Sequence, residues 1–344
     1  MANDAVPGST GCSFLGEVVD VRTYLNLVLG LAAAGAMTLL VACSAANSPS
    51  VAPAPASYAW HFTSHDSCPA TAPIKYVSDN LFNVVNVYVG KFAGQAPCGQ
   101  IASGLLNGPA GLYVQPKTHD LYVANEGGRN VLVFHRGQMA PFNTYTDPTV
   151  QLPNDVTVAT DGTVIASNYS NLSQPVAGSI STWIGGPNGG TFVGNFPMRD
   201  SNLGAYITAK SNGTIFFDEL DRLNLKGSLW HVACPAGACG FQIRIPHVIL
   251  HFPGGVAIDS TGDLIVADSV AETADTFELP NPVPSIFPMV GEPFALAINT
   301  KDHHVFVSDG LDGDAAEYSY PHGALIGTVK GALGGSPDGV AVDP

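Results

Sequence analysis

Short runs of alternating apolar and polar residues recur along the chain from about residue 74 to its end. In the clearest copy, residues 253–259 and 262–268 are two such runs joined by a turn of Asp, Ser, Thr and Gly. Alternation with a period of two places one face of an extended segment in a core, and a polar turn between two such segments is typical of a β-hairpin. The sequence therefore predicts a chain of short antiparallel strands.

These hairpins belong to a longer repeat. Copies of the first run occupy residues 111–114, 155–158, 204–207, 255–258, 295–298 and 339–342, at spacings of 40 to 51 residues. Copies of the second run occupy residues 121–125, 164–168, 215–219, 264–268, 305–309 and 75–79. A third run with β character occupies residues 131–134, 179–184, 228–232, 276–279, 316–320 and 84–89, and a weaker fourth follows, for example at 190–196, 240–245 and 324–329. Four strands at this interval, with no helical periodicity between them, predict a β-propeller.

The two ends of the repeat region complement each other. The copy at 75–79 lacks a first strand, and the chain stops just after a lone first strand at 339–342. Pairing the two completes a sixth blade and leaves no exposed edge along the ring. We therefore expect an all-β fold, a six-bladed β-propeller of four-stranded antiparallel blades over residues 73–344, rather than an open β-sandwich or two β domains.

The N-terminal segment has a different pattern. Residues 25–42 form an uncharged apolar run that ends in Leu40-Val41-Ala42-Cys43, which resembles the lipobox of bacterial prelipoproteins. The resemblance implies a signal peptide over residues 1–42, a lipidated Cys43 and a flexible Pro/Ser-rich tether over 43–72. Residues 1–24 carry a single cation, Arg22, so we expect the true start close before it. The chain would be exported and anchored by lipid to the periplasmic or cell-surface face of a bacterial membrane; a simple N-terminal membrane anchor is the alternative.

Four further cysteines lie in the remaining chain: Cys68, Cys98, Cys234 and Cys239. Outside the cytoplasm an even number favours disulfides. A turn separates Cys234 from Cys239, which predicts a local bridge and leaves Cys68 to pair with Cys98. The alternative is a zinc site that uses His231, Cys234, Cys239 and His247, although their spacing fits no common zinc pattern.

The net charge of the chain limits the classes of partner that it can bind. The 344 residues are 46% apolar and 12% charged, with a net charge of −15. Nucleic-acid binding requires a basic surface that neutralises phosphates, so the acidic balance excludes a nucleic-acid partner. An anionic membrane would not attract such a domain, which leaves the lipid anchor as its membrane contact. We expect a monomer whose partner is a protein, peptide or glycan.

The repeat also predicts where a ligand would bind. The ends of the second strands and the starts of the first strands share one face of a propeller, which also carries the longer loops. Asp and Asn at the second-strand ends are the candidate ligand-face residues: Asp79, Asn125, Asn168, Asp218, Asp268 and Asp309. Because the pattern repeats in every blade, these side chains could instead cap turns through hydrogen bonds to the backbone.

Residues 253–269 resemble the NHL repeat, and residues 125–134 resemble its second half. The resemblance covers about residues 74–344 and implies the propeller fold, which serves binding scaffolds, lyases and lactonases alike. Pro153-Asn154-Asp155 and Pro337-Asp338-Gly339 resemble segments of the SMP-30/gluconolactonase family. That resemblance implies a divalent ion, such as Ca²⁺, at the channel mouth, held by Asn154, Asn202 and Asp338.

The chain departs from that family at one decisive position. Gly254 stands where the family has its acid–base aspartate, so no catalytic residue can be assigned. The sequence therefore favours a lipid-anchored binding module that acts through the loop-bearing face. A divalent-metal-dependent lactonase, hydrolase or lyase is the alternative hypothesis.

Overall fold

The computed structural model describes residues 68, 73–102, 104–169, 178–199, 206–220, 226–279, 284–299, 301, 303–310, 313–329 and 337–343. Residues Ala59–Pro344 form one compact unit. The predicted signal peptide of residues 1–42 and the predicted lipid site Cys43 lie outside the described residues. No helix within the described ranges has the length and hydropathy required to cross a membrane.

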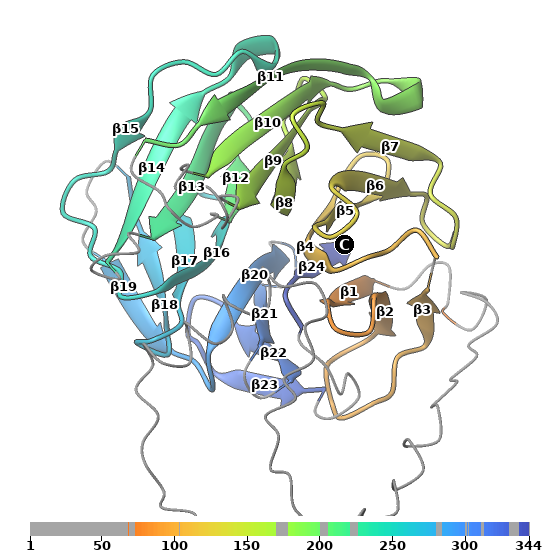
Figure 1. Ribbon diagram of the computed structural model, residues 1–344. Coiled ribbons are helices and arrows are strands. Elements are labelled where there is room, and N and C mark those ends of the chain that lie inside the picture. The colour runs from red at the N-terminus through yellow and green to blue at the C-terminus, as the bar shows by residue number, and fades with distance from the viewer. Residues whose placement is uncertain are drawn as a thin grey trace, which may run out of the picture. The chain divides into compact units, whose positions relative to one another are not determined.

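Six four-stranded antiparallel sheets are arranged as blades in a ring (Figure 1). From the innermost strand outward, the first two blades are β24 (Val340–Asp343), β1 (Ile74–Asp79), β2 (Val84–Val89) and β3 (Gly99–Ile101), then β4 (Pro109–Val114), β5 (Leu121–Asn125), β6 (Asn130–Phe134) and β7 (Asn143–Thr146). The third and fourth are β8 (Leu152–Val158), β9 (Thr163–Tyr169), β10 (Ser179–Ile184) and β11 (Thr191–Pro197), then β12 (Ile207–Ala209), β13 (Thr214–Leu220), β14 (Gly227–Ala233) and β15 (Ile243–Arg244). The fifth and sixth are β16 (Pro253–Ile258), β17 (Leu264–Asp268), β18 (Thr273–Phe277) and β19 (Pro284–Pro288), then β20 (Pro293–Asn299), β21 (His304–Asp309), β22 (Asp314–Ser319) and β23 (Leu325–Thr328). Two 3₁₀ turns, η2 (Pro187–Gly189) and η3 (Pro235–Gly237), lie between third and fourth strands.

The predicted fold class is confirmed, and so are most strand positions. The clearest difference is β18, which begins at Thr273 rather than at 276. The preceding connection is shorter than the sequence suggested, because Asp268 Oδ1 accepts the Ala271 N–H at 3.3 Å and closes a tight turn. An Asx turn of this kind lets the third strand start at once.

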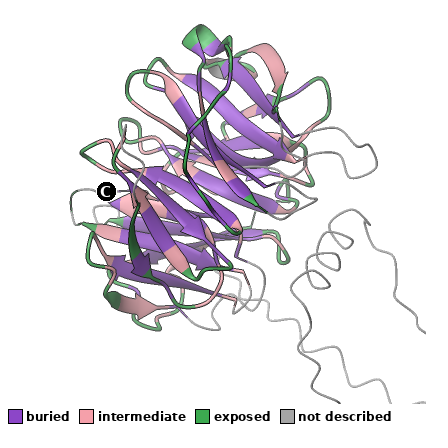
Figure 2. Cartoon of the chain, turned by 90° about the vertical axis from the view of Figure 1, so that its left-hand side faces the viewer, coloured by how far each residue is buried: buried purple, intermediate pink, exposed green. Residues whose placement is uncertain are grey.

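Apolar side chains fill the space between neighbouring blades, so the strands are buried while most connections are exposed (Figure 2). One such contact joins the first and sixth blades, where the ring of Phe92 packs edge-to-face on Tyr88 at 5.4 Å and on Phe306 at 5.6 Å between centroids. Aromatic pairs in this arrangement add favourable quadrupole contacts to the hydrophobic burial. Packing between blades is therefore what holds the ring together.

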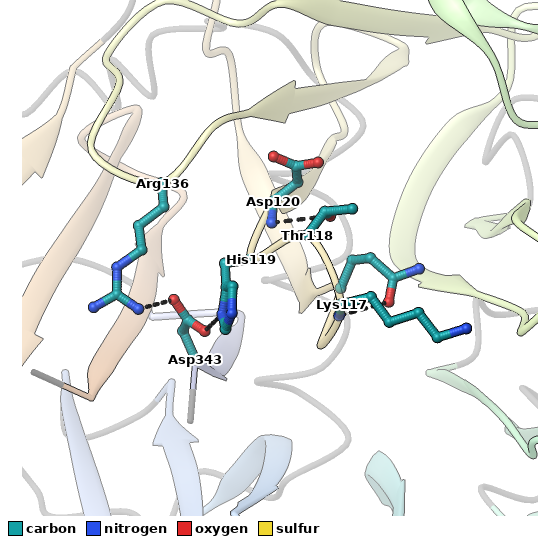
Figure 3. A network of polar contacts seen from close by, with 7 residues as sticks. Lys117, Thr118, His119, Asp120, Arg136 and Asp343 are labelled. Atoms are coloured by element: carbon teal, nitrogen blue, oxygen red, sulfur yellow. Dashed lines mark hydrogen bonds and ion pairs between the residues drawn. The ribbon is translucent and has the colours of Figure 1, made fainter. Parts of the chain in front are cut away.

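The ring is closed by the C-terminal strand. β24 pairs antiparallel with β1, from Ile74↔Asp343 to Val77↔Val340, as the sequence predicted. Figure 3 shows the carboxylate of Asp343 between Arg136 and His119, which both belong to the second blade. The Arg136 Nη1 and His119 Nδ1 atoms each lie 2.5 Å from an Asp343 oxygen, and Asp343 is fully buried. These ion pairs fasten the last strand to the neighbouring blade.

Both predicted disulfides are present. Cys68 is bonded to Cys98, and Cys234 to Cys239. The first bridge ties the segment before β1 to the connection before β3, and the second closes the turn around η3. Because Cys234 and Cys239 are oxidised, they cannot serve as thiolate ligands, and the alternative zinc site is wrong. Disulfides are typical of proteins in an oxidising, extracytoplasmic compartment.

Candidate functional site

The two ends of the ring differ in their connections. All innermost strands start at one end, here named the loop face, which carries the connections from second to third strands and from one blade to the next. The opposite end, here named the turn face, carries the short connections from first to second strands, such as residues 115–120 and 259–263. Antiparallel strand order within each blade fixes this division.

At the loop face the innermost strands pack closely against one another. Their starts share a pattern in which a proline is followed two residues later by a small residue: Gly111, Gly255, Ala295 and Gly339. A Cβ atom on Gly255 would lie 2.2 Å from the Leu296 nitrogen, and one on Gly339 would lie 2.2 Å from the Ala110 oxygen. A larger side chain therefore has no room there, and the channel is narrow at this end.

The third blade departs from this pattern, because Asp155 takes the place of the small residue. Its Oδ2 accepts the Ile207 N–H of the fourth blade at 2.9 Å, and its Oδ1 accepts its own strand's Val156 N–H at 2.8 Å. A Cβ on Gly111 would lie 2.0 Å from Asp155 Oδ1, so that glycine makes room for the carboxyl group. Burial raises the pKa of Asp155 to about 7, although the two N–H donors act in the opposite direction.

Tyr206 lies across the channel just beyond Asp155. Its backbone N–H donates to Asp218 Oδ1 at 2.8 Å, and its hydroxyl donates to the Asp338 carbonyl at 3.4 Å. The first bond lies within the fourth blade, and the second joins that blade to the chain that enters β24. Burial raises the pKa of the Tyr206 phenol well above its usual value, and Tyr169 and the nearby carboxylates add to this effect.

Four carboxyl groups influence the titration of Tyr169, and three of them also influence that of Tyr206. Glu126, Asp338, Asp218 and Asp155 each raise the pKa of Tyr169, after burial as the main cause. Burial also raises the pKa of Asp218 well above its usual range and that of Glu126 to about 7. We name this set the acid–tyrosine cluster: Glu126, Asp155, Tyr169, Tyr206, Asp218 and Asp338.

One atom of the acid–tyrosine cluster points to a ligand. Asp218 is 2% exposed, and its Oδ2 accepts no hydrogen bond from the described residues. A buried carboxylate oxygen without a donor is costly unless a proton or a cation neutralises it. A proton neutralises the Asp218 carboxyl group below its raised pKa, and a cation can take its place above it, so the site disfavours an anion.

The predicted ligand-face residues are brought to this end of the ring but are all buried, with exposures of 0 to 2%. Most bond to nearby backbone. Asp79 accepts the Phe82 N–H at 3.0 Å, Asn125 accepts the Asn107 N–H at 2.6 Å, and Asp268 accepts the His251 and Phe252 N–H groups. Asn168 donates to Ser179 and Ser181, and the Asp309 carboxylate fills the space beside Gly291. Of this set, Asp218 belongs to the acid–tyrosine cluster.

Two of the predicted metal ligands are described. Asn154 is buried at the start of β8, and Asp338 is half-buried before β24, while Asn202 lies outside the described residues. Among the described residues, no three His, Cys, Asp or Glu side chains are grouped so that they could hold a metal ion. Gly254, the missing acid–base position, has no room for a carboxylate, because a Cβ there would lie 2.6 Å from the Phe294 oxygen.

Sequence reasoning missed a cavity of about 490 Å³ in the middle of the ring. All six innermost strands line it, and its aliphatic walls include Leu112, Val114, Val256, Ile258, Ala297 and Val342. Asp155 and Tyr206 lie at its loop-face end, while His119, Asn299 and Lys301 lie at its turn-face end. Exposure rises toward the turn face along β12 and β16, as from buried Val256 to half-buried Ile258, so the cavity opens there. The replacement of a small residue by Asp155 was the signal in the sequence.

No protein-family model and no curated protein matches this chain in sequence. Solved structures resemble it in fold. A chain from a nidogen/laminin complex matches with a TM-score of 0.60 and 12% identity, over 79% of this chain and 98% of that chain. A protein of unknown function from Bacteroides caccae matches with a TM-score of 0.56 and 11% identity, over 79% and 99%. A functionally unknown protein from Desulfotomaculum acetoxidans matches with a TM-score of 0.54 and 12% identity, over 78% of this chain and 98% of that chain. At such identities the likeness shows the fold alone.

Proposed function

We propose that this protein is an exported, lipid-anchored β-propeller that binds a protein partner through its loop face. The observation that carries the proposal is the distribution of exposed large apolar side chains. Of the thirteen such side chains among the described residues, seven lie on connections of the loop face, namely Leu81, Phe82, Leu105, Val150, Ile249, Val270 and Val290, whereas two, Phe142 and Phe241, lie on connections of the turn face. Apolar groups gathered on one face of a domain mark an interaction surface.

Three of these residues lie on two connections that are bonded to each other, and are named here the loop-face patch: Leu81, Phe82 and Leu105. Their exposures are 65%, 55% and 60%. The two connections that carry them are held together, because the Gly108 N–H donates to Asn83 Oδ1 at 2.6 Å. One exposed aromatic ring and two exposed aliphatic side chains on connections that are bonded together fit the apolar centre of a protein interface better than they fit a glycan.

Charge indicates what surrounds that apolar centre on the partner. The chain has a net charge of −15, so a partner with basic residues around an apolar patch is favoured electrostatically and attracted over distance. Export is supported by the two disulfides and by the lipobox-like segment that ends at Cys43.

Photo-crosslinking in intact cells tests this function. With p-benzoylphenylalanine in place of Phe82, we expect a discrete adduct that is lost when Leu105→Ser is added. The matched control is the same replacement at Phe142, which is 47% exposed on the turn face and should give no such adduct. No adduct at position 82, or the same adduct at both positions, would contradict binding through the loop face.

One observation favours a second candidate function, that of a protein that binds a divalent metal ion. The carboxylates of Asp218 and Asp338 and the amide of Asn154 lie at the starts and ends of strands on one face, and oxygen ligands of this kind suit Ca²⁺ or Mg²⁺. The position of Gly254 does not fit the acid–base chemistry of the family that the sequence resembles. We therefore assign any metal there a binding or electrostatic role.

Metal content separates this candidate from the first. Mass spectrometry of the purified protein should find about one equivalent of a divalent ion, and Asp338→Ala and Asn154→Ala should each lose it because a hard cation needs several oxygen ligands. Asp263→Ala, at a turn on the opposite face, should retain the ion. A folded protein without metal, or equal metal in all variants, would dismiss the metal site.

A further inference from the structure

We propose that the central cavity binds a short peptide with free termini, which enters from the turn face and places its ammonium group at Asp155 and its carboxylate at Lys301. The mouth of this site is at the opposite end of the ring from the loop-face patch, and the site does not depend on the proposed protein partner. The inference rests on the walls of the cavity, its two ends and its length.

The walls are made of sheet edges. β4, β8, β12, β16, β20 and β24 are each the terminal strand of their sheet, and all six line the cavity. An edge strand directs main-chain N–H and C=O groups to its free side, here toward the channel, while aliphatic side chains such as Val256 and Ala297 fill the space between. The cavity thus offers alternating donors, acceptors and apolar contacts.

This combination selects the chemistry of the ligand. An alkyl chain would cover the main-chain groups without bonding to them, and a buried N–H or C=O that loses its water partner is costly. A peptide carries its own N–H and C=O groups at the spacing of a β-strand. Extended peptides use these groups to bond to exposed sheet edges in β-augmentation. Small side chains fit beside the aliphatic walls.

The two ends of the cavity carry opposite charges when Asp155 is ionised, as it is above its pKa of about 7. At the closed end, each Asp155 oxygen accepts one main-chain N–H, and a carboxylate has about four acceptor positions, so an ammonium group can still be bound. At the open end, Lys301 is exposed and its backbone N–H is held by Asn299 Oδ1 at 3.1 Å. The His119 imidazole stands on the same rim. A zwitterion with separated ends is complementary to this arrangement.

The length of the cavity sets the length of the peptide. Along β20 the lining runs from Ala295 to Asn299, and at about 3.3 Å per residue these five residues span about 13 Å. An extended chain of four residues has about the same length. Tripeptides and tetrapeptides are therefore the expected ligands.

Calorimetric titration of the full chain with tetraalanine tests the proposal. We expect binding that becomes about tenfold weaker when either terminus is capped, because each cap removes a charge-assisted hydrogen bond. Asp155→Asn should abolish the preference for a free N-terminus only, and Lys301→Ala the preference for a free carboxylate only. Lys117→Ala, on the same face but outside the cavity, is the matched control and should bind as the unchanged protein does.

A further variant keeps the test decisive if Asp155→Asn does not fold. Ala297→Trp fills the cavity from the middle of β20 and should abolish binding while thermal unfolding stays cooperative. The proposal is overturned if tetraalanine does not bind at millimolar concentration, if capping has no effect, if Ala297→Trp still binds, or if Lys117→Ala changes the affinity as much as Lys301→Ala does.

Discussion

Deletion of residues 337–344 is expected to abolish cooperative unfolding of the propeller. β24 is the innermost strand of the first blade, and its Val340 and Ala341 are buried between blades. Without it, the edge of β1 and the apolar interior beside it are exposed to water, and no other strand of the described chain can replace it. Circular dichroism during heating should show a broad, non-cooperative change instead of one transition.

A point substitution gives a graded form of the same experiment. Asp343→Ala removes a fully buried carboxylate and leaves Arg136 and His119 without their shared partner. Breaking a buried ion pair from one side costs about 3 kcal/mol, which corresponds to a fall of about 5 °C in Tm for a domain of this size. Asp263→Ala, at an exposed turn of the same face, should change the Tm by less than about 1 °C. Equal effects of the two substitutions would show that the last strand is not held by these ion pairs.

Stability is expected to fall as the pH rises from 4 to 8, and Asp155 is expected to be a main cause. The folded protein holds the proton of Asp155 up to about pH 7, whereas the unfolded chain releases it near pH 4. The stabilisation is therefore complete below pH 4 and is lost as the pH passes through 7. A shift of about 3 pKa units corresponds to at most about 4 kcal/mol. The raised pKa values of Glu126 and Asp218 act in the same direction.

Urea unfolding at pH 5, 6, 7 and 8 measures this dependence. In the Asp155→Asn variant the neutral amide cannot titrate. The pH dependence of its free energy of unfolding should therefore correspond to the release of about one proton fewer on unfolding than in the unchanged protein. The variant should be less stable at pH 5 by about 1 kcal/mol, because the amide can accept through only one oxygen. Asp263→Asn should retain the full pH dependence. If the unchanged protein is more stable at pH 8 than at pH 5, or if Asp155→Asn leaves the slope unchanged, the carboxyl group is not buried as described.

The sequence predicted the six blades because the information needed is local. Each hairpin, such as residues 253–268, shows its period of two and its turn within about 16 residues. Ring closure could also be predicted, because the unpaired copies at 75–79 and 339–342 complement each other. The boundaries of β18 were less accurate, since one side-chain bond from Asp268 to the Ala271 N–H decides where the turn ends.

The candidate site was predicted only in part. Asp218 was singled out at the end of a second strand on the loop face, and Asp338 by the resemblance to the SMP-30/gluconolactonase family; both belong to the acid–tyrosine cluster. Glu126, Tyr169 and Tyr206 carry no repeat signal of their own. Tyr206 acquires its position from bonds to Asp218, 12 residues away, and to Asp338, 132 residues away.

By itself the sequence determined the blade count, the pairing of the terminal strands and the two disulfides, because strand periodicity and cysteine spacing are properties of short segments. The tertiary structure alone decided what lies at the centre. The cavity, its closed end at Asp155 and its open end at Lys301 arise where six strands from distant parts of the chain converge on one axis. Which side chains meet there depends on the register and tilt of each blade after the ring has closed, and no local pattern encodes that.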